Sequence, residues 1–187
     1  MGERPHIRWL KIALAIAALQ ALLVVLYLRI DRERSAAPDA DAGYEPLPPR
    51  AAPDIALLAL DGTTTMLSAS RGRPVLLHFW GTWCGPCKDE LPGLLELGEE
   101  LEHSNKGQLI ALSLDADWQP VKAFFSEAVP RAVVRAGGGD AASAFDVAAL
   151  PDTYLIHADG SIGGRFGGAR DWRSEHLRTK LMEELAR

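Results

Sequence analysis

The two cysteines of the chain, Cys84 and Cys87, are the residues whose type and spacing are best suited to chemistry. They lie three positions apart in Trp83-Cys84-Gly85-Pro86-Cys87, where a predicted buried strand ends and a predicted helix begins. Unpaired N–H groups and the helix dipole stabilise a thiolate at a helix N-terminus, which lowers the thiol pKa. Pro86 suits the first helical turn because no backbone N–H is required there. The spacing therefore predicts a redox-active disulfide, with Cys84 as the exposed nucleophile and Cys87 as the resolving thiol.

Two other interpretations of the cysteine pair are a static disulfide and half of a metal site. A bridge that closes so short a loop contributes little stability, because disulfide stabilisation grows with loop length. A zinc site needs two more ligands, and the five histidines show no paired spacing. Redox chemistry is the favoured interpretation, and no metal is expected.

The elements around the cysteines alternate between strand and helix patterns. The continuous apolar run Val75–Trp80 predicts a central strand covered on both faces, and a helix is expected from Cys84 to about Glu102, with a kink at Pro92. Asp61-Gly62 predicts a hairpin between residues 55–60 and 63–67. The remaining expected strands are 109–114, 132–135, 153–157 and 161–166, and the remaining expected helices are about 118–128, 141–147 and 172–185. This order predicts an α/β domain around a mixed sheet.

The N-terminal part of the sequence has a different character. Residues 12–28 carry no charge, which predicts a transmembrane anchor over residues 12–30, although cleavage near Ser35 is an alternative. Residues 31–53 hold five of the twelve prolines and predict a linker, so residues 1–11 would be cytoplasmic and the folded domain would span residues 54–187. Basic residues flank the apolar run equally on both sides, so charge alone leaves the orientation open.

Charge argues against a nucleic-acid partner. The chain has a formal net charge of −5, and residues 54–187 carry 13 basic and 19 acidic residues.

The segment from Phe79 to Pro92, FWGTWCGPCKDELP, resembles the active-site segment of TlpA/ResA-type membrane-anchored thioredoxin-like proteins. The resemblance covers about residues 53–187 and includes Gly168-Ala169-Arg170-Asp171-Trp172, which is similar to the turn before the last helix. It implies a thioredoxin fold, with a mixed central sheet, helices on both faces, an added βα unit and an N-terminal β-hairpin. It also implies that the domain is periplasmic or otherwise extracytoplasmic, held at the cytoplasmic membrane by its single span.

The resemblance also points to substrate-binding positions. Leu150-Pro151, just before an expected strand, is similar to the family's cis-proline loop, whose backbone pairs with a bound substrate segment. The alternative is an ordinary X-Pro strand entry. Trp83, Gly85 and Pro86 are expected to shape the docking surface, although Trp83 could equally be a core residue.

Glu90 is the expected proton-transfer residue. It lies three residues after Cys87, on the same helical face, and it matches the acidic residue of the ResA-type motif. The alternative is a solvated helix carboxylate. His78 occupies the position of the buried aspartate of thioredoxin proper, and it is interpreted as a packed strand histidine rather than a titrating one. Trp80 is expected in the core.

We therefore expect a thiol:disulfide oxidoreductase that reduces disulfides in extracytoplasmic client proteins, as in cytochrome c maturation or copper-centre assembly. A membrane thiol–disulfide electron donor would reduce it again, and the Cys84–Cys87 disulfide would be its only redox group. The alternatives are an oxidase or isomerase on the same fold, a peroxidase, and a copper-handling module that uses the cysteine pair.

Overall fold

The computed structural model describes residues 16, 18–25, 43–126, 128–137 and 140–186. The chain divides into two units, Met1–Ala40 and Asp41–Arg187. In the first unit, residues 18–25 are helical, while the rest of the expected anchor, apart from Ile16, lies outside the described residues. Within the described part of the chain, no helix is both long and apolar enough to cross a membrane. The anchor therefore stays a prediction.

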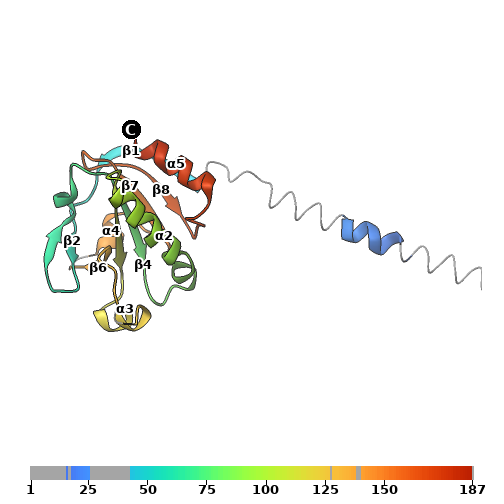
Figure 1. The fold of residues 1–187 in the computed structure, drawn as a ribbon, viewed down its shortest axis with the longest axis horizontal. Helices are drawn as coiled ribbons and strands as arrows, with labels where there is room; N and C mark the ends of the chain where they lie inside the picture. Colours follow the sequence, from blue (N-terminus) through green and yellow to red (C-terminus); the bar gives the residue numbers. More distant parts are fainter. Residues whose placement is uncertain (1–15, 17, 26–42, 127, 138–139, 187) are drawn as a thin grey trace, which may run out of the picture. The chain divides into compact units, whose positions relative to one another are not determined.

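The second unit is built on one sheet of eight strands in the order β1-β8-β7-β4-β5-β6-β2-β3 (Figure 1). The strands are β1 (Tyr44–Ala51), β2 (Ala56–Leu58), β3 (Thr64–Met66), β4 (Val75–Trp80), β5 (Gln108–Ser113), β6 (Val133–Ala136), β7 (Asp152–Ile156) and β8 (Ser161–Gly167). Strands β4, β5 and β6 pair in parallel, and every other pairing is antiparallel. The expected mixed sheet is confirmed.

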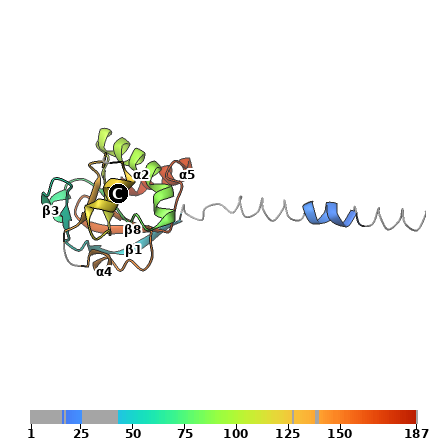
Figure 2. The ribbon, with the colours of Figure 1, turned by 90° about the horizontal axis from the view of Figure 1, so that it is seen from below.

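The helices cover the two faces of this sheet. They are the 3-10 helix η2 (Leu67–Ser70) and the α-helices α2 (Gly85–His103), α3 (Trp118–Phe124), α4 (Ala141–Ala144) and α5 (Glu175–Leu185). Figure 2 shows α2 and α5 on one side of β1 and β8, and α4 on the other. Two buried apolar clusters correspond to these two sides, one containing Leu94 of α2 and Leu181 of α5, and the other containing Ala141 of α4.

Several expected elements are confirmed with small shifts of their ends. All six residues of β4 are buried, as a strand covered on both faces requires. The hairpin around Asp61-Gly62 is β2 and β3, and it pairs through β2 with β6 at one edge of the sheet. Helix α2 continues through Pro92. Between β5 and β7 the chain adds α3, β6 and α4, which include the βα unit expected from the resemblance.

Strand β1 corrects the expected domain boundary. Residues 44–51 were expected in the linker, but they form an edge strand against β8, with an irregular register between Pro46 and Arg50. Prolines are tolerated there because an edge strand has one side that donates no ladder hydrogen bonds, and they also block pairing with other chains. The folded domain therefore begins about ten residues earlier than the expected residue 54.

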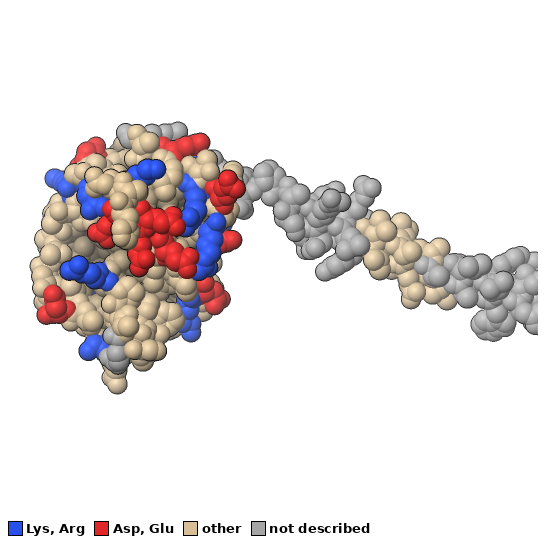
Figure 3. Space-filling model, viewed as in Figure 1, with Lys and Arg blue, Asp and Glu red and all other residues tan. Residues whose placement is uncertain are grey.

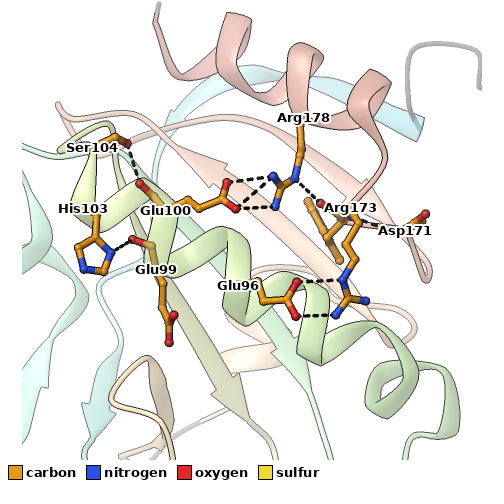
Figure 4. Close-up of polar contacts among 9 residues, drawn as sticks. Glu96, Glu99, Glu100, His103, Ser104, Asp171, Arg173 and Arg178 are labelled. Carbon is orange, nitrogen blue, oxygen red and sulfur yellow. Dashed lines mark hydrogen bonds and ion pairs between the residues drawn. The ribbon is translucent and has the colours of Figure 1, made fainter.

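Ion pairs fasten the C-terminal segment to α2. Arg173 binds Glu96 through two hydrogen bonds of 2.9 and 2.7 Å, and Arg178 of α5 binds Glu100 at 2.9 to 3.2 Å (Figure 4). Figure 3 shows acidic side chains gathered on this face of the domain, where the exposed glutamates of α2 lie. Two-point contacts of this kind fix orientation better than single exposed ion pairs. They hold α5 and the segment before it against the second half of α2.

Candidate active site

The cysteine pair lies at the start of α2, just after the short loop that follows β4. Cys84 is the N-cap residue of α2, Pro86 is in the first turn, and Cys87 is joined to Cys84 by a disulfide. The backbone N–H of Cys87 donates to the Cys84 sulfur at 3.3 Å, so that sulfur receives one of the unpaired N–H groups of the helix start. Cys84 is 8% exposed and Cys87 is 0% exposed. Only Cys84 is therefore within reach of a partner, which is the geometry expected of a nucleophile and a resolving thiol.

A carboxylate just after the neighbouring strand β5 holds the loop before Cys84. The side chain of Asp115 accepts hydrogen bonds from the backbone N–H and hydroxyl of Thr82, at 3.0 and 2.6 Å, and from the hydroxyl of Ser113 at 2.8 Å. Gly81 leaves room for the turn, because a Cβ at that position would lie 2.8 Å from the Trp83 ring. Asp115 was not predicted from the sequence. Its position just after an apolar strand, parallel to β4, was the available signal.

An apolar groove of about 550 Å³ opens beside Cys84. Trp83, Gly85 and Pro86 line one part of it, and Leu150 lines another. Trp83 is 66% exposed, so the core interpretation of this residue is wrong, whereas Trp80 is fully buried as expected. The remaining lining residues come from just after β5, from α4 and from the segment before β7, and were not predicted from sequence: Leu114, Ala142, Val147, Ala148 and Ala149.

The peptide bond between Leu150 and Pro151 is cis, as the resemblance implied. The carbonyl of Pro151 accepts a hydrogen bond from Gly168 at 2.9 Å, which ties the loop to the end of β8. Leu150 is half-buried and shares the groove with Cys84. The cis-proline loop and the cysteine pair are therefore brought to one surface, as expected.

Glu90 lies beneath that surface. The residue is 7% exposed, and its Oε2 accepts a hydrogen bond of 2.5 Å from the backbone N–H of Arg170. Burial raises the pKa of Glu90 to about 7, against the opposing effects of the Arg170 hydrogen bond and the Trp172 side chain. A pocket of about 310 Å³, lined by Pro86, Glu90 and the segment around Arg170, lies next to this carboxyl. The solvated-carboxylate interpretation is wrong, and Glu90 is poised to exchange protons near neutral pH.

His78 faces Glu90 from the central strand. The imidazole is fully buried, its Nδ1 lies 2.9 Å from the hydroxyl oxygen of Thr153, and its Nε2 lies 3.6 Å from Glu90 Oε1. Burial lowers the pKa of His78 to about 3, so the ring is neutral at ordinary pH. This agrees with a packed strand histidine.

Another buried carboxylate follows the cis-proline. Asp152 is 3% exposed and its Oδ2 lies 3.8 Å from an Arg165 nitrogen. Burial raises the pKa of Asp152, while Arg165 acts in the opposite direction. Successive strand residues point to opposite faces, so Asp152 lies on the other side of β7 from Thr153 and His78. Asp152 was not predicted as a site residue from the sequence.

Comparisons with known proteins agree with this geometry. Residues 48–164 match the model of the AhpC/TSA family. The chain belongs to this family. It is 34% identical over 138 residues to the thiol-disulfide oxidoreductase ResA of Bacillus thuringiensis subsp. konkukian, a match that covers 72% of this chain and 74% of ResA. It is 35% identical over 118 residues to ResA of Oceanobacillus iheyensis, covering 60% of each chain.

Solved structures give the same result. A Chlorobium tepidum protein described as a thiol:disulfide interchange protein DsbE has a TM-score of 0.65 at 27% identity, with 75% of this chain and 99% of that chain covered. A thiol-disulfide oxidoreductase from Bacteroides fragilis has a TM-score of 0.60 at 26% identity, covering 72% and 98%. This member of the AhpC/TSA family is therefore a thiol:disulfide oxidoreductase of the ResA and DsbE type with a thioredoxin-like fold. The roles of its individual residues stay predictions.

Proposed function

We propose that this oxidoreductase reduces disulfides in extracytoplasmic client proteins while its N-terminal segment anchors it in the cytoplasmic membrane. The observation that carries the proposal is the pairing of a reachable Cys84 with a buried Cys87 beside an apolar groove that Leu150 helps to line. Clients in cytochrome c maturation or copper-centre assembly fit this function. A membrane thiol–disulfide donor would return the Cys84–Cys87 pair to the dithiol state.

The proposed reaction has two exchange steps. The Cys84 thiolate attacks one sulfur of the client disulfide, which forms a mixed disulfide and releases the other client sulfur as a thiolate. Glu90 then accepts the proton of Cys87, and the resulting thiolate attacks the Cys84 sulfur. The second client thiolate leaves as the Cys84–Cys87 disulfide forms. Two electrons pass to the client, and its thiolates take protons from Glu90 and water.

The groove indicates how a client would dock. Its lining is apolar around the exposed indole of Trp83 and includes Pro86 and Leu150. An extended client segment could place an apolar side chain in the groove and pair with the backbone of Leu150, as strand-addition complexes do. Main-chain pairing is tolerant of sequence, which suits an enzyme with several clients.

A turnover assay on the full-length chain in detergent tests this function. With dithiothreitol as reductant, the parent should reduce insulin disulfides catalytically, and Cys84→Ala should have no activity above the uncatalysed rate. Lys88→Ala, which changes an exposed helix residue next to Cys87, is the matched control and should remain active. Oxidation of a reduced client without insulin reduction would favour the oxidase alternative. Stoichiometric Cu(I) retention through dialysis, without turnover, would favour a copper-handling module, and peroxide consumption would favour a peroxidase.

A further inference from the structure

The strongest unexplained feature of the domain is a pair of facing polar atoms in its core. His78 Nε2 and Glu90 Oε1 are both buried, lie 3.6 Å apart, and have no hydrogen-bond partner among the described residues. Buried polar atoms are normally paired, because an unpaired one loses its interaction with water without replacement. The separation is only slightly longer than a hydrogen bond, and such contacts often tighten during the reaction.

The second polar atom of each side chain already has a hydrogen-bond partner. Glu90 Oε2 accepts the Arg170 N–H at 2.5 Å, so the proton of a neutral Glu90 belongs on Oε1, the oxygen that faces His78. His78 Nδ1 lies 2.9 Å from the Thr153 hydroxyl, which can either donate or accept. In this pair of side chains, the two atoms without a partner are thus the two that face each other. The buried Trp172 indole N–H also acts on Glu90, but an indole can only donate, so it cannot accept a proton from a neutral carboxyl.

The protonation state of Glu90 then determines which nitrogen of His78 carries the proton. A neutral Glu90 donates from Oε1, so Nε2 must be bare and Nδ1–H donates to Thr153. An ionised Glu90 only accepts, so Nε2 must carry the proton and the Thr153 hydroxyl donates to Nδ1. The ring stays neutral in both arrangements, because only its tautomer changes.

We propose that His78 is a positioning residue for Glu90, exchanging tautomers as Glu90 gains and loses its proton so that the carboxyl keeps a partner in both states. The proposal rests on the proposed role of Glu90 as proton acceptor for Cys87. His78 takes no net proton in this scheme: it loses one at Nδ1 and gains one at Nε2, while the net change occurs on Glu90.

The other charged groups near Glu90 do not supply this function. From the segment before α5, Arg170 approaches through its backbone N–H and its charge, while Asp171 and Arg173 line the neighbouring pocket with Asp89 of α2. Arg173 is bound to Glu96. Across the sheet, Asp152 faces the opposite side. Thr153, which is not ionisable, contributes only its hydroxyl, so His78 is the titratable group that faces Oε1.

The direct test uses the unaltered full-length chain. Nitrogen-15 NMR distinguishes protonated from bare imidazole nitrogens, and the His78 signals can be assigned by their loss in His78→Gln. As the pH rises through about 7, the protonated nitrogen should change from Nδ1 to Nε2. In Glu90→Gln the tautomer should not change with pH. A tautomer that stays fixed in the parent, or a doubly protonated ring, would overturn the proposal.

Two variants give an independent measurement, the pKa of Glu90 followed by carbon-13 NMR of its carboxyl. His78→Leu removes both hydrogen-bonding nitrogens. The Glu90 pKa should rise by about one unit, because an ionised carboxylate gains more from an N–H donor than a neutral carboxyl gains from an acceptor. His78→Gln keeps an amide that can donate or accept, and it should restore most of the parental pKa.

These measurements separate the inference from the function on which it rests. An unchanged or lower Glu90 pKa in His78→Leu would contradict the positioning role, and failure of His78→Leu to fold leaves the parental tautomer measurement decisive. If the tautomer changes as described but Glu90→Gln reduces clients at the parental rate, the coupling of His78 to Glu90 stands and the catalytic role of Glu90 fails.

Discussion

The backbone N–H of Arg170 donates to Glu90 across eighty positions of sequence, at 2.5 Å. This contact makes the turn before α5 part of the site under the cysteines. The ion pairs of Arg173 with Glu96 and of Arg178 with Glu100 hold the same segment against α2. The C-terminal segment therefore helps to set the protonation of a residue in the first half of α2.

Replacing Glu90 with glutamine should slow turnover about 100- to 10,000-fold, because general acid–base assistance at Cys87 is lost. The parental rate should rise with pH through about 7, as Glu90 ionises and can accept the Cys87 proton. The variant should lose this inflection. Stopped-flow measurement of client reduction between pH 5 and 9 gives both quantities, and an unchanged profile would contradict the assignment.

The same variant has a stability signature that separates proton transfer from packing. Burial raises the folded pKa of Glu90 from 4.5 to about 7, so its contribution to stability is complete below about pH 4.5 and is lost as the pH rises through 7. The Glu90→Gln side chain does not ionise, so the variant does not lose stability in this way as the pH rises. Its amide oxygen can still accept the Arg170 N–H. Its stability relative to the parent should increase by roughly 1 to 3 kcal/mol between pH 4.5 and 8, measured by urea unfolding.

Trp83→Ala should weaken client binding without destabilising the domain. The side chain is 66% exposed, so the free energy of unfolding should change by less than about 0.5 kcal/mol. Loss of an exposed indole from a docking groove should raise the KM for a protein client about tenfold. Met66→Ala removes another exposed apolar side chain, on β3, and should leave KM unchanged. An equal KM increase for a small disulfide would show that Trp83 acts on the cysteines instead.

Asp115→Ala should destabilise the domain by about 2 to 4 kcal/mol. It removes three hydrogen bonds to a carboxylate and leaves the Thr82 N–H without its partner. Asp115→Asn keeps acceptor capacity and should lose less, while the exposed Asp89→Ala should be close to the parent. Chemical unfolding measures all three. A loss for Asp115→Ala equal to that for Asp89→Ala would mean that the contact does not hold the loop.

The contrast between Glu90 and Asp115 shows which parts of the site can be predicted from the sequence. Residues related by local periodicity were predicted correctly: the central strand from its apolar run, the hairpin from Asp61-Gly62, and the helical face shared by Cys87 and Glu90. The contact of His78 with Glu90 depends on how α2 packs over β4, and that of Thr82 with Asp115 depends on strand pairing. Neither contact produces a local pattern in the sequence from which it could be predicted.

Strand β1 was missed for a different reason. Its prolines are typical of linkers, and only the position of the strand at the edge of the sheet makes them compatible with pairing.

The Cys84–Cys87 couple should be reducing, with a potential more negative than about −200 mV. The reasons are the Gly85-Pro86 dipeptide between the cysteines and the apolar Leu150 before Pro151. Equilibration with glutathione or dithiothreitol buffers, followed by thiol alkylation, gives the value. A potential near −120 mV, in the range of strong oxidants, would reverse the proposed direction of electron flow.

The unequal burial of the two cysteines predicts where the reaction stops when one is removed. Cys87→Ala leaves the reachable Cys84 without a resolving thiol, so mixed disulfides between Cys84 and client proteins should accumulate in cells that express the full-length chain. Cys84→Ala should accumulate none, because the remaining thiol is fully buried. Non-reducing electrophoresis and mass spectrometry identify the adducts. Adducts on Cys87 would overturn the nucleophile assignment. Adducts with cytoplasmic proteins would place the domain on the opposite side of the membrane, because a thiolate can trap only the disulfides that share its compartment.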